Sequence, residues 1–588
     1  MLILKTSIMK KPGVINYFFL TLVLFAGTVL LYALLGVIPS EGFNPSDDGV
    51  ILAQSYRLLQ GQIPHLDFIS IRPVGSAVLH SIHFISPLPL EISARWLTLL
   101  QYLSYSLLWA WIMVRFTRIR KYRGLIFFIL LGIWGFLLNQ NHYNLYPWTT
   151  IDALFWMILA LSFYLPNSSG LFQKRGWIKI ALITFFASMA ALSRQTFVLP
   201  ALILVFSLVN LGIKRKKWMQ LLVGLIAGGI PVFTYISVLV LNAALPLFFQ
   251  QMTGRTELLE TGFKQFFIEF WNSPLVWFYI LVIFLLLLYR LTEGSSAGNV
   301  YRLALIPLGR YIFAALFTVL AFYVFLSPGS LFGQSFMQFW LLVLLWVFEE
   351  VTKQIKAPQR RWFFWIILIS WTSAISMGDN APVFALGLIN ATAMGYILFQ
   401  FAERGLSFRR LTHLQVFSGA LLVALIILSL RTQRNVNYRD VPAGAQEYEL
   451  KSIFPELGNV RTNANTFSYL QEVDKLYQEL GFPYGRFVVL PNAAIIYPII
   501  DTPNPLPVDW MQGPEFIGSE DILAERIRAA VTGREIFFLI DKFDSKLMAD
   551  SLFPAKYPED VYPYMKEIID LTHEYQVESE WFSVRVSK

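Results

Sequence analysis

The stretch IKIALITFFASMAALSRQTFVLPALILVFSLVNLGI, residues 178–213, decides the fold class. As a single α-helix, its roughly 36 residues would extend about 54 Å at 1.5 Å per residue. The hydrocarbon core of a bilayer is only about 30 Å thick, so one crossing cannot accommodate this length. The polar triplet Ser193-Arg194-Gln195 divides the stretch. We therefore predict two membrane spans, 178–193 and 196–213, that meet at Arg194.

Similar apolar runs recur along most of the 588-residue chain, of which 56% is hydrophobic and 14% charged. Soluble domains carry about 25% charged residues. The sequence therefore predicts a polytopic α-helical membrane protein. We expect about thirteen transmembrane helices, near 14–37, 92–114, 124–140, 149–165, 178–193, 196–213, 219–242, 274–290, 304–326, 334–350, 362–377, 382–402 and 414–431.

Basic residues set the orientation of these spans. They gather in alternate short loops, such as RFTRIRKYR (115–123), KRKK (214–217) and KQIKAPQRR (353–361). Cytoplasmic loops carry an excess of Lys and Arg, so these loops are predicted to lie inside. The net charge of +9 then reflects topology and not nucleic-acid binding. The N-terminus is predicted to be cytoplasmic and to lead into a retained first span, since no A-x-A-like cleavage site follows it.

With an odd number of spans, the segment after the last one lies outside. We predict a transmembrane module at 1–434 and an extracytoplasmic C-terminal domain at 435–588. Strand candidates FVVLP (487–491) and EIFFLID (535–541) flank the helix candidate 521–533, which suggests a small α/β domain. Two long outer loops, 38–91 and 243–273, are amphipathic. They are predicted to lie in the interface plane and to roof a cavity open to water and lipid.

Ionisable residues at the outer edge of the predicted bundle point to a site, because charges at membrane depth cost about 2.5–3.5 kcal/mol each. Asp47 and Asp48 follow the first span, in NPSDDGVILAQSYRLLQGQIPHLDF (44–68). Either carboxylate could act as a general base on a hydroxyl, or the pair could hold a divalent cation together with Asp152. The alternative to these functional roles is that the acidic pair caps the start of one helix and Asp152 the start of another. His142 lies in the interfacial stretch NQNHYN (139–144).

Cations occur on the same predicted face. Arg194, Arg72 and Arg255 are candidates for holding a phosphate, because a guanidinium stays charged and binds oxyanions through a planar fork. The simpler alternative is that these side chains extend to the lipid headgroups. The chain has no cysteine, no Gly-x-Ser-x-Gly element and no nucleotide-binding glycine loop.

Four elements carry a family resemblance. AQSYRLLQGQIPHLDFISIRPVG (53–75) follows a first span and an acidic pair, SRQTF (193–197) enters a later span, and GDNAPVFALG (378–387) and VVLPNAAIIYPIIDTPNPLP (488–507) come further on. Together they resemble the GT-C superfamily of membrane glycosyltransferases, especially bacterial dolichyl-phosphate-mannose-protein mannosyltransferase-like and aminoarabinose transferase-like proteins. The resemblance covers the whole chain. One departure is Asp48, where the family has an Asp-Glu type pair.

The resemblance implies transfer of a hexose or pentose from a polyprenyl-phosphate donor to an acceptor hydroxyl, usually with inversion. Asp47, or Asp48, is then the general base, Asp152 the acidic residue of the second outer loop, and Arg194 the phosphate contact. His142, in the same loop, is a further candidate for contacting a metal ion or the acceptor. The implied partners are membrane lipids, the lipid-linked sugar and an acceptor glycan, lipid or protein, in a bacterial plasma membrane. A divalent metal ion is an open question. The alternatives are a transporter or flippase of lipid-linked saccharides, and a polysaccharide polymerase or ligase.

Overall fold

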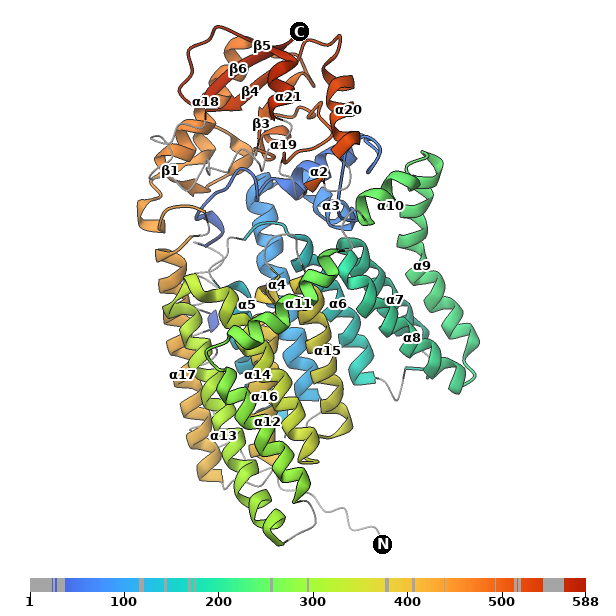
Figure 1. The fold of residues 1–588 in the computed structure, drawn as a ribbon, viewed down its shortest axis with the longest axis vertical. Coiled ribbons are helices and arrows are strands. Elements are labelled where there is room, and N and C mark those ends of the chain that lie inside the picture. Colours follow the sequence, from blue (N-terminus) through green and yellow to red (C-terminus); the bar gives the residue numbers. More distant parts are fainter. Residues whose placement is uncertain are drawn as a thin grey trace.

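The computed structural model describes residues 24, 27, 28 and 38–588, except 116–120, 142–144, 168–170, 174–175, 254–256, 293–295, 376–379, 404–407, 438, 492, 512–514, 517–519 and 543–564. Long helices stand side by side in the lower part of the molecule, and the C-terminal domain lies on one end of them (Figure 1). The first outer loop lies between these two parts. This arrangement places the loop that carries the acidic pair against both of them.

Apolar helices form the lower part, and every predicted span from 92–114 onward coincides with one of them. By length and composition, eight described helices can cross a membrane, or nine if one bent pair counts as a span. The predicted span 14–37 lies almost entirely outside the described residues. The chain is thus a multi-span helical membrane protein, built from α4 (Leu90–Arg115), α5 (Lys121–Gln140), α6 (Thr149–Tyr164), α7 (Gly176–Ser193), α8 (Val198–Lys214), α9 (Trp218–Leu241), α12 (Val276–Leu291), α13 (Ser296–Leu326), α14 (Leu331–Val351), α15 (Ala357–Ala374), α16 (Leu386–Glu403) and α17 (Phe408–Asn435).

The predicted break inside 178–213 is confirmed. Helix α7 ends at Ser193, and a short 3-10 helix, Gln195–Phe197, opens α8. Arg194 stands between them in an extended conformation, with φ −153° and ψ 124°. The chain therefore reverses at the one buried cation of this stretch, which fixes Arg194 at the end of both helices nearest the C-terminal domain (Figure 1).

The second long loop forms two helices, α10 (Leu245–Thr253) and α11 (Glu257–Asn272). The axis of α11 makes an angle of 91° with that of α12. Phe263, Phe267 and Trp271 are exposed on α11, whereas Phe266 is buried against the bundle. An apolar exposed face on a helix perpendicular to a span is what a helix lying in the membrane interface requires. The place of α11 in the membrane interface stays a prediction.

The C-terminal segment forms the expected α/β domain. Strands β3 (Phe487–Leu490) and β4 (Phe537–Asp541) are parallel neighbours, and α20 (Glu520–Val531) lies between them in sequence. The sheet order is β3-β4-β6-β5, with antiparallel β5 (Thr572–Glu574) and β6 (Phe582–Ser587) that the sequence analysis missed. A separate two-stranded sheet joins β1 (Tyr448–Glu449) to β2 (Arg461–Thr462). Helix α18 (Ala464–Leu480) packs on the main sheet, and α19 (Ile496–Ile499) and α21 (Met565–Asp570) complete the domain.

The first outer loop corrects a prediction. Its helix α2 (Val50–Leu59) does not lie free in the interface plane, because every residue from Val50 to Arg57 is buried by protein. A Cβ added at Gly49 would come within 2.1 Å of the Ile495 nitrogen, so the helix start touches the backbone of the C-terminal domain. The amphipathic pattern was real, but its polar face is covered by that domain and not by water. Helix α3 (Gly75–His80) then returns to the bundle.

A buried ion pair lies inside the bundle, between α13 and α14. Arg310 on α13 donates two hydrogen bonds of 2.6 Å to the two carboxylate oxygens of Glu349 on α14. Tyr396 on α16 donates a third hydrogen bond of 2.6 Å to Glu349. Both charged side chains have an exposed fraction of 0%. Three helices are therefore joined by one neutralised pair, which is a structural role and not a relay of charges across the bundle.

Candidate functional site

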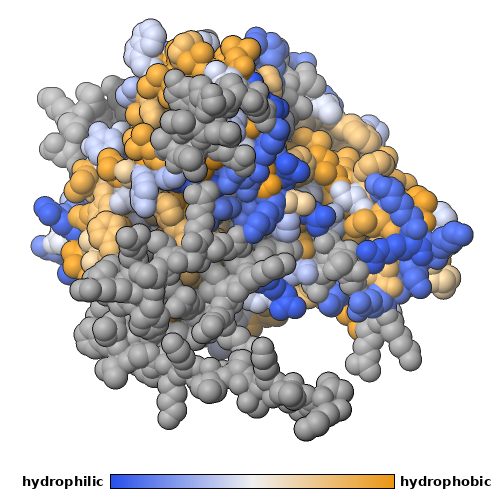
Figure 2. All heavy atoms as spheres, turned by 90° about the horizontal axis from the view of Figure 1, so that it is seen from below, coloured by the Kyte–Doolittle hydropathy of each residue, from blue (hydrophilic) through white to orange (hydrophobic). Residues whose placement is uncertain are grey.

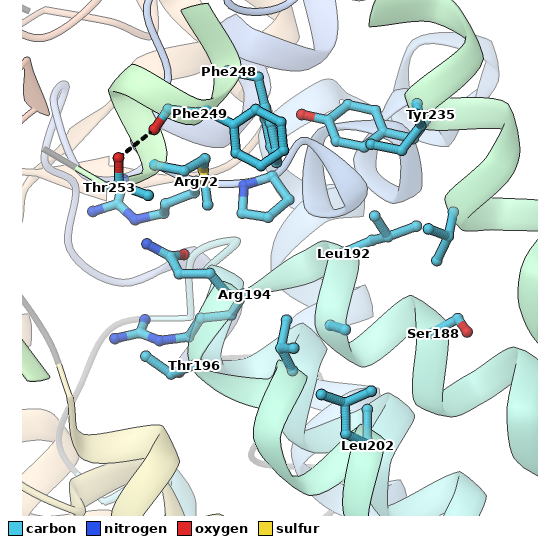
Figure 3. Close-up of a pocket in the computed structure, with 18 of the residues that line it drawn as sticks. Arg72, Ser188, Leu192, Arg194, Thr196, Leu202, Tyr235, Phe248, Phe249 and Thr253 are labelled. Carbon is cyan, nitrogen blue, oxygen red and sulfur yellow. Dashed lines mark hydrogen bonds between the residues drawn. The ribbon is translucent and has the colours of Figure 1, made fainter. Parts of the chain in front are cut away.

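A cavity of about 770 Å³ lies where the first outer loop, α7, α8, α9 and α10 meet. Arg72 and Arg194 stand at one end of it, whereas Leu192, Leu202 and Ser188 lie toward the other (Figure 3). The rest of the lining is mainly apolar and comes from α7, α8 and α9. The cavity thus joins a cationic end to an apolar body.

Arg194 is the buried cation of this cavity, with an exposed fraction of 5%. Its guanidinium donates hydrogen bonds to the hydroxyls of Thr149, at 3.3 Å, and Thr150 at the start of α6, and to the Ile375 carbonyl oxygen, at 2.5 Å. All three are neutral acceptors, and among the described residues no carboxylate forms an ion pair with Arg194 within 4 Å. Within the part of the chain that the structure describes, this buried cation is therefore held by neutral oxygens, and an anion bound beside it would neutralise its charge.

Arg72 reaches the same end of the cavity from the first outer loop. Its guanidinium donates two hydrogen bonds, of 2.9 and 3.0 Å, to the carboxylate of Glu515 in the C-terminal domain. It also lies 5.4 Å from the ring centroid of Trp148, within cation–π range. The C-terminal domain therefore orients one of the two cations of the cavity. The sequence analysis did not find Glu515 or Trp148.

Gln251 lines the cavity on the side of α10 and contacts His65 of the first outer loop. The His65 ring nitrogens contact the Gln251 side-chain oxygen at 2.7 Å and the Tyr235 hydroxyl at 2.6 Å. Gln251 also donates to the His65 carbonyl oxygen at 3.0 Å and accepts from the Ser70 N–H at 3.1 Å. Burial lowers the pKa of His65 to about 4, so the ring is neutral at pH 7. The second long loop is thereby fastened to the first.

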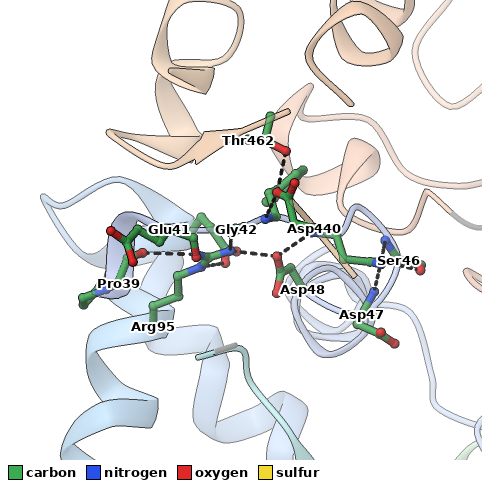
Figure 4. A network of polar contacts seen from close by, with 12 residues as sticks. Pro39, Glu41, Gly42, Ser46, Asp47, Asp48, Arg95, Asp440 and Thr462 are labelled. Atoms are coloured by element: carbon green, nitrogen blue, oxygen red, sulfur yellow. Dashed lines mark hydrogen bonds and ion pairs between the residues drawn. The ribbon is translucent and has the colours of Figure 1, made fainter. Parts of the chain in front are cut away.

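The acidic pair does not line this cavity, and its two carboxylates point in different directions (Figure 4). Asp48 is fully buried and accepts hydrogen bonds from Arg95 Nη2 at 2.8 Å and from the Asn44 N–H at 3.0 Å. Asp47 forms an ion pair of 3.0 Å with Arg439, whose side chain is 30% exposed. Asp48 is thus held inside the fold, whereas the partner of Asp47 can be reached from solvent.

The charges around Arg95 further distinguish Asp48 from Asp47 as a possible general base. Arg95 on α4 is shared by the carboxylates of Asp48 and Glu91, so two acids surround one guanidinium. Burial raises the pKa of Asp48 from its ordinary value to about 8, against the attraction of Arg95. A carboxyl group that keeps its proton at pH 7 is a poor general base. Of the two, Asp47 is therefore the better candidate.

Asp152 sits in a buried chain of polar side chains that the sequence analysis did not anticipate. Its Oδ1 is 3.3 Å from His80 Nε2 and accepts a hydrogen bond of 2.7 Å from Gln101. His80 in turn contacts His83 at 2.9 Å, and His83 contacts the Ser93 hydroxyl at 3.0 Å. The other oxygen of Asp152 is buried with no hydrogen-bond partner among the described residues. Asp152 follows Thr149 and Thr150, the partners of Arg194, by less than one helical turn.

The structure brings together only some of the predicted site residues. Arg72 and Arg194 share the cavity, and Asp152 is linked to Arg194 through the start of α6. Asp47 and Asp48 stand apart, beside the C-terminal domain. His142 and Arg255 lie outside the described residues. No group of three or more Asp, Glu or His among the described residues is arranged to hold a metal ion, so Asp47, Asp48 and Asp152 do not form one shared metal site in this arrangement.

Comparison with known proteins gives two matches among solved structures. One is ArnT from Cupriavidus metallidurans bound to undecaprenyl phosphate, with 13% sequence identity, a TM-score of 0.44, and coverage of 97% of this chain and 98% of that chain. The other is the archaeal oligosaccharyltransferase AglB from Archaeoglobus fulgidus in complex with an inhibitory peptide and a dolichol-phosphate, with 12% identity, a TM-score of 0.42, and coverage of 90% and 69%. No protein-family model and no curated protein matches the chain.

Proposed function

We propose that this protein is a GT-C-type glycosyltransferase that moves a sugar from a polyprenyl-phosphate carrier to an acceptor hydroxyl. The reaction takes place on the side of the membrane that carries the C-terminal domain. We place the protein in a bacterial plasma membrane because the chain resembles bacterial proteins. The distribution of basic loops orients the N-terminus toward the cytoplasm. The sugar is a hexose or pentose, and inversion is the expected outcome.

One observation supports this proposal: a buried guanidinium that pairs with no carboxylate among the described residues stands at the end of a mainly apolar cavity. A polyprenyl phosphate has the complementary shape and charge, with one anionic group at the end of a hydrocarbon chain. Arg194 would bind the phosphate, and Arg72 would provide a second cation when the ligand binds beside the Arg72–Glu515 ion pair. The walls from α7, α8 and α9 would receive the first isoprene units.

The chemistry then needs a proton acceptor and a stabilised leaving group. The acceptor oxygen would form a bond to the anomeric carbon as the bond from that carbon to the phosphate oxygen breaks. The electron pair passes to the phosphate, where Arg194 and Arg72 stabilise the charge. The hydroxyl proton would pass to Asp47, which requires the bound sugar to extend out of the cavity toward the first outer loop, because Asp47 does not line the cavity. Because Asp47 is paired with Arg439, the incoming acceptor must displace that partly exposed cation before the carboxylate can act.

Asp152 has a supporting role in this scheme. Its Oδ1 is fixed by His80 and Gln101, which leaves the buried Oδ2 available for a hydroxyl of the sugar or the acceptor. A buried acceptor without a partner costs about 1–3 kcal/mol, so a substrate hydroxyl that satisfies it would be favoured. The acceptor itself, whether glycan, lipid or protein, is not determined by these contacts.

The decisive experiment compares Arg194→Gln with wild type in two assays. In the first, undecaprenyl phosphate is titrated into the purified full chain in detergent. In the second, the envelope glycans and lipids of a deletion strain complemented with each variant are compared by mass spectrometry. Lys264→Gln on α11, where the side chain is 65% exposed, is the matched control. We expect Arg194→Gln to lose both binding and the sugar modification, and the control to keep both.

The alternatives give different results in the same strains. A flippase would leave the glycosidic linkages unchanged in a detergent assay and would move the lipid-linked saccharide across proteoliposomes. A polymerase or ligase would transfer an intact oligosaccharide in one step. Unchanged undecaprenyl phosphate binding by Arg194→Gln would overturn the assignment of the cavity.

A further inference from the structure

A second large cavity lies against α4, α5 and α6, away from α8, α9 and α10. It has a volume of about 760 Å³ and is a groove between α4, α5, α6 and the start of α7. Its walls are aliphatic and aromatic, with two serines. The lining residues used below are Ser104, Trp111, Phe128, Phe163, Arg115 and Lys179. None of them belongs to the cavity of Arg72 and Arg194, and the proposed glycosyl transfer makes no use of this groove.

Two cations stand at the end of the groove that is farther from the C-terminal domain. Arg115 is the last residue of α4, and Lys179 lies in the first turn of α7. Figure 2 views the molecule from this end and shows hydrophilic side chains gathered between hydrophobic surfaces. The Arg115 guanidinium lies 5.5 Å from the ring centroid of Trp111, which holds it over the groove instead of letting it extend away.

The length of the groove matches one leaflet. Its lining on α4 runs from Arg115 up to Ser104, and eleven residues of helix rise about 16 Å. Half of the roughly 30 Å hydrocarbon core is about 15 Å. A lipid whose phosphate lies at Arg115 and Lys179 would therefore place an acyl chain along the groove and end it near the middle of the bilayer.

We infer that this groove binds an anionic phospholipid from the leaflet opposite the C-terminal domain. Arg115 and Lys179 bind the phosphate and the net negative headgroup, and the wall formed by Trp111, Phe128 and Phe163 holds one acyl chain. Basic pockets between transmembrane helices are a known means of binding anionic headgroups. Charge complementarity selects this occupant over a zwitterionic lipid, whose own ammonium group would meet the two cations.

The test uses the full chain purified in detergent and depleted of lipid. Phosphatidylglycerol and phosphatidylcholine are added separately, and bound lipid is counted by native mass spectrometry. Each cation near the membrane surface contributes roughly a fivefold change in affinity. We therefore expect Arg115→Gln/Lys179→Gln to bind phosphatidylglycerol roughly 30-fold more weakly than wild type. Lys216→Gln/Lys217→Gln, which removes the same charge from exposed positions outside the groove, should bind like wild type.

Ser104→Trp provides a second and uncharged variant, because it fills the far end of the groove. We expect it to reduce phosphatidylglycerol binding while leaving the monodisperse elution of the protein unchanged. Three results would overturn the inference. The first is equal binding of phosphatidylcholine and phosphatidylglycerol by wild type, and the second is an equal loss of binding in the two charge variants. The third is complete displacement of phosphatidylglycerol by inorganic phosphate, which would mean that the apolar groove contributes nothing to binding.

Discussion

The adjacent acids Asp47 and Asp48 should give opposite phenotypes when each is changed to alanine. Asp48→Ala removes the acceptor of one Arg95 N–H and of the Asn44 N–H, both in fully buried surroundings. Each buried donor left without an acceptor costs about 1–3 kcal/mol, so the two together come to about 2–6 kcal/mol of unfolding free energy. We expect a lower apparent melting temperature and lower protein abundance.

Asp47→Ala removes a different kind of contact. Its partner Arg439 is 30% exposed, so the loss should be about 1 kcal/mol or less. If Asp47 accepts the proton from the acceptor, the transfer rate should fall by about 10²–10⁴. Transfer per folded molecule is the informative quantity, measured alongside thermal unfolding. Asp67→Ala, which changes an exposed carboxylate on the same loop, should leave transfer unchanged.

The pH dependence of stability gives an independent check on Asp48. Its folded-state pKa is raised to about 8 from an ordinary value of 3.8. A raised folded pKa means that the stabilising contribution is complete below pH 3.8 and is lost as the pH rises through about 8. The stability difference between wild type and Asp48→Ala should therefore be larger at pH 5 than at pH 8. The reasoning is refuted if Asp48→Ala is stable but inactive while Asp47→Ala unfolds.

Three further predictions concern the surrounding contacts. Arg194→Gln should weaken undecaprenyl phosphate binding roughly 10- to 150-fold, as expected for the loss of a charge-assisted hydrogen bond worth about 1.5–3 kcal/mol. Calorimetric titration measures the Kd, and an unchanged Kd would contradict the prediction. His80→Ala should lower transfer more than thermal stability, because it removes one of the two contacts that orient Oδ1 of Asp152 and leaves only Gln101; similar losses in both measurements would mean that the histidine only packs. Arg310→Met should destabilise the bundle by about 3–5 kcal/mol, because it leaves Glu349 buried without its cation. Adding Glu349→Met should restore most of that loss, and thermal unfolding compares the two variants. A double variant no more stable than the single one would show that the unpaired charge does not cause the destabilisation.

Several features of the fold were readable from the sequence because they are local. Apolar runs near 20 residues mark helices that must cross a bilayer, and each described one forms where it was expected. The reversal at Arg194 followed from the length of the apolar stretch and from the polar triplet 193–195 that divides it. The parallel strands β3 and β4 followed from short apolar runs on either side of a helix. Strand β5 escaped notice because its three polar residues gain strand geometry only from the sheet beside them. Strand β6 was missed although FSVRVS (582–587) alternates apolar and polar residues, a pattern that favours a strand.

The surroundings of α2 show where local reasoning fails. Its alternation of apolar and polar faces is the same whether water or protein covers the polar face. The contacts that decide the matter come from distant parts of the chain. Arg57 pairs with Asp509 at 2.8 Å, and Tyr56 donates to Asp501 at 2.8 Å. No periodicity in residues 50–59 encodes a partner some 450 positions away.

The sequence by itself determined a multi-span helical protein, a cation at the turn between two spans, and an acidic pair after the first one. Those features depend on hydrophobicity and spacing, which act over a few turns of helix. Only the tertiary structure decided that Asp48 is enclosed with Arg95, that His80 and Gln101 fix Asp152, and that Arg72 and Arg194 lie at the same end of one cavity. Burial, pKa and charge pairing depend on which distant side chains surround a group, and that is settled only when the helices, the first outer loop and the C-terminal domain pack together.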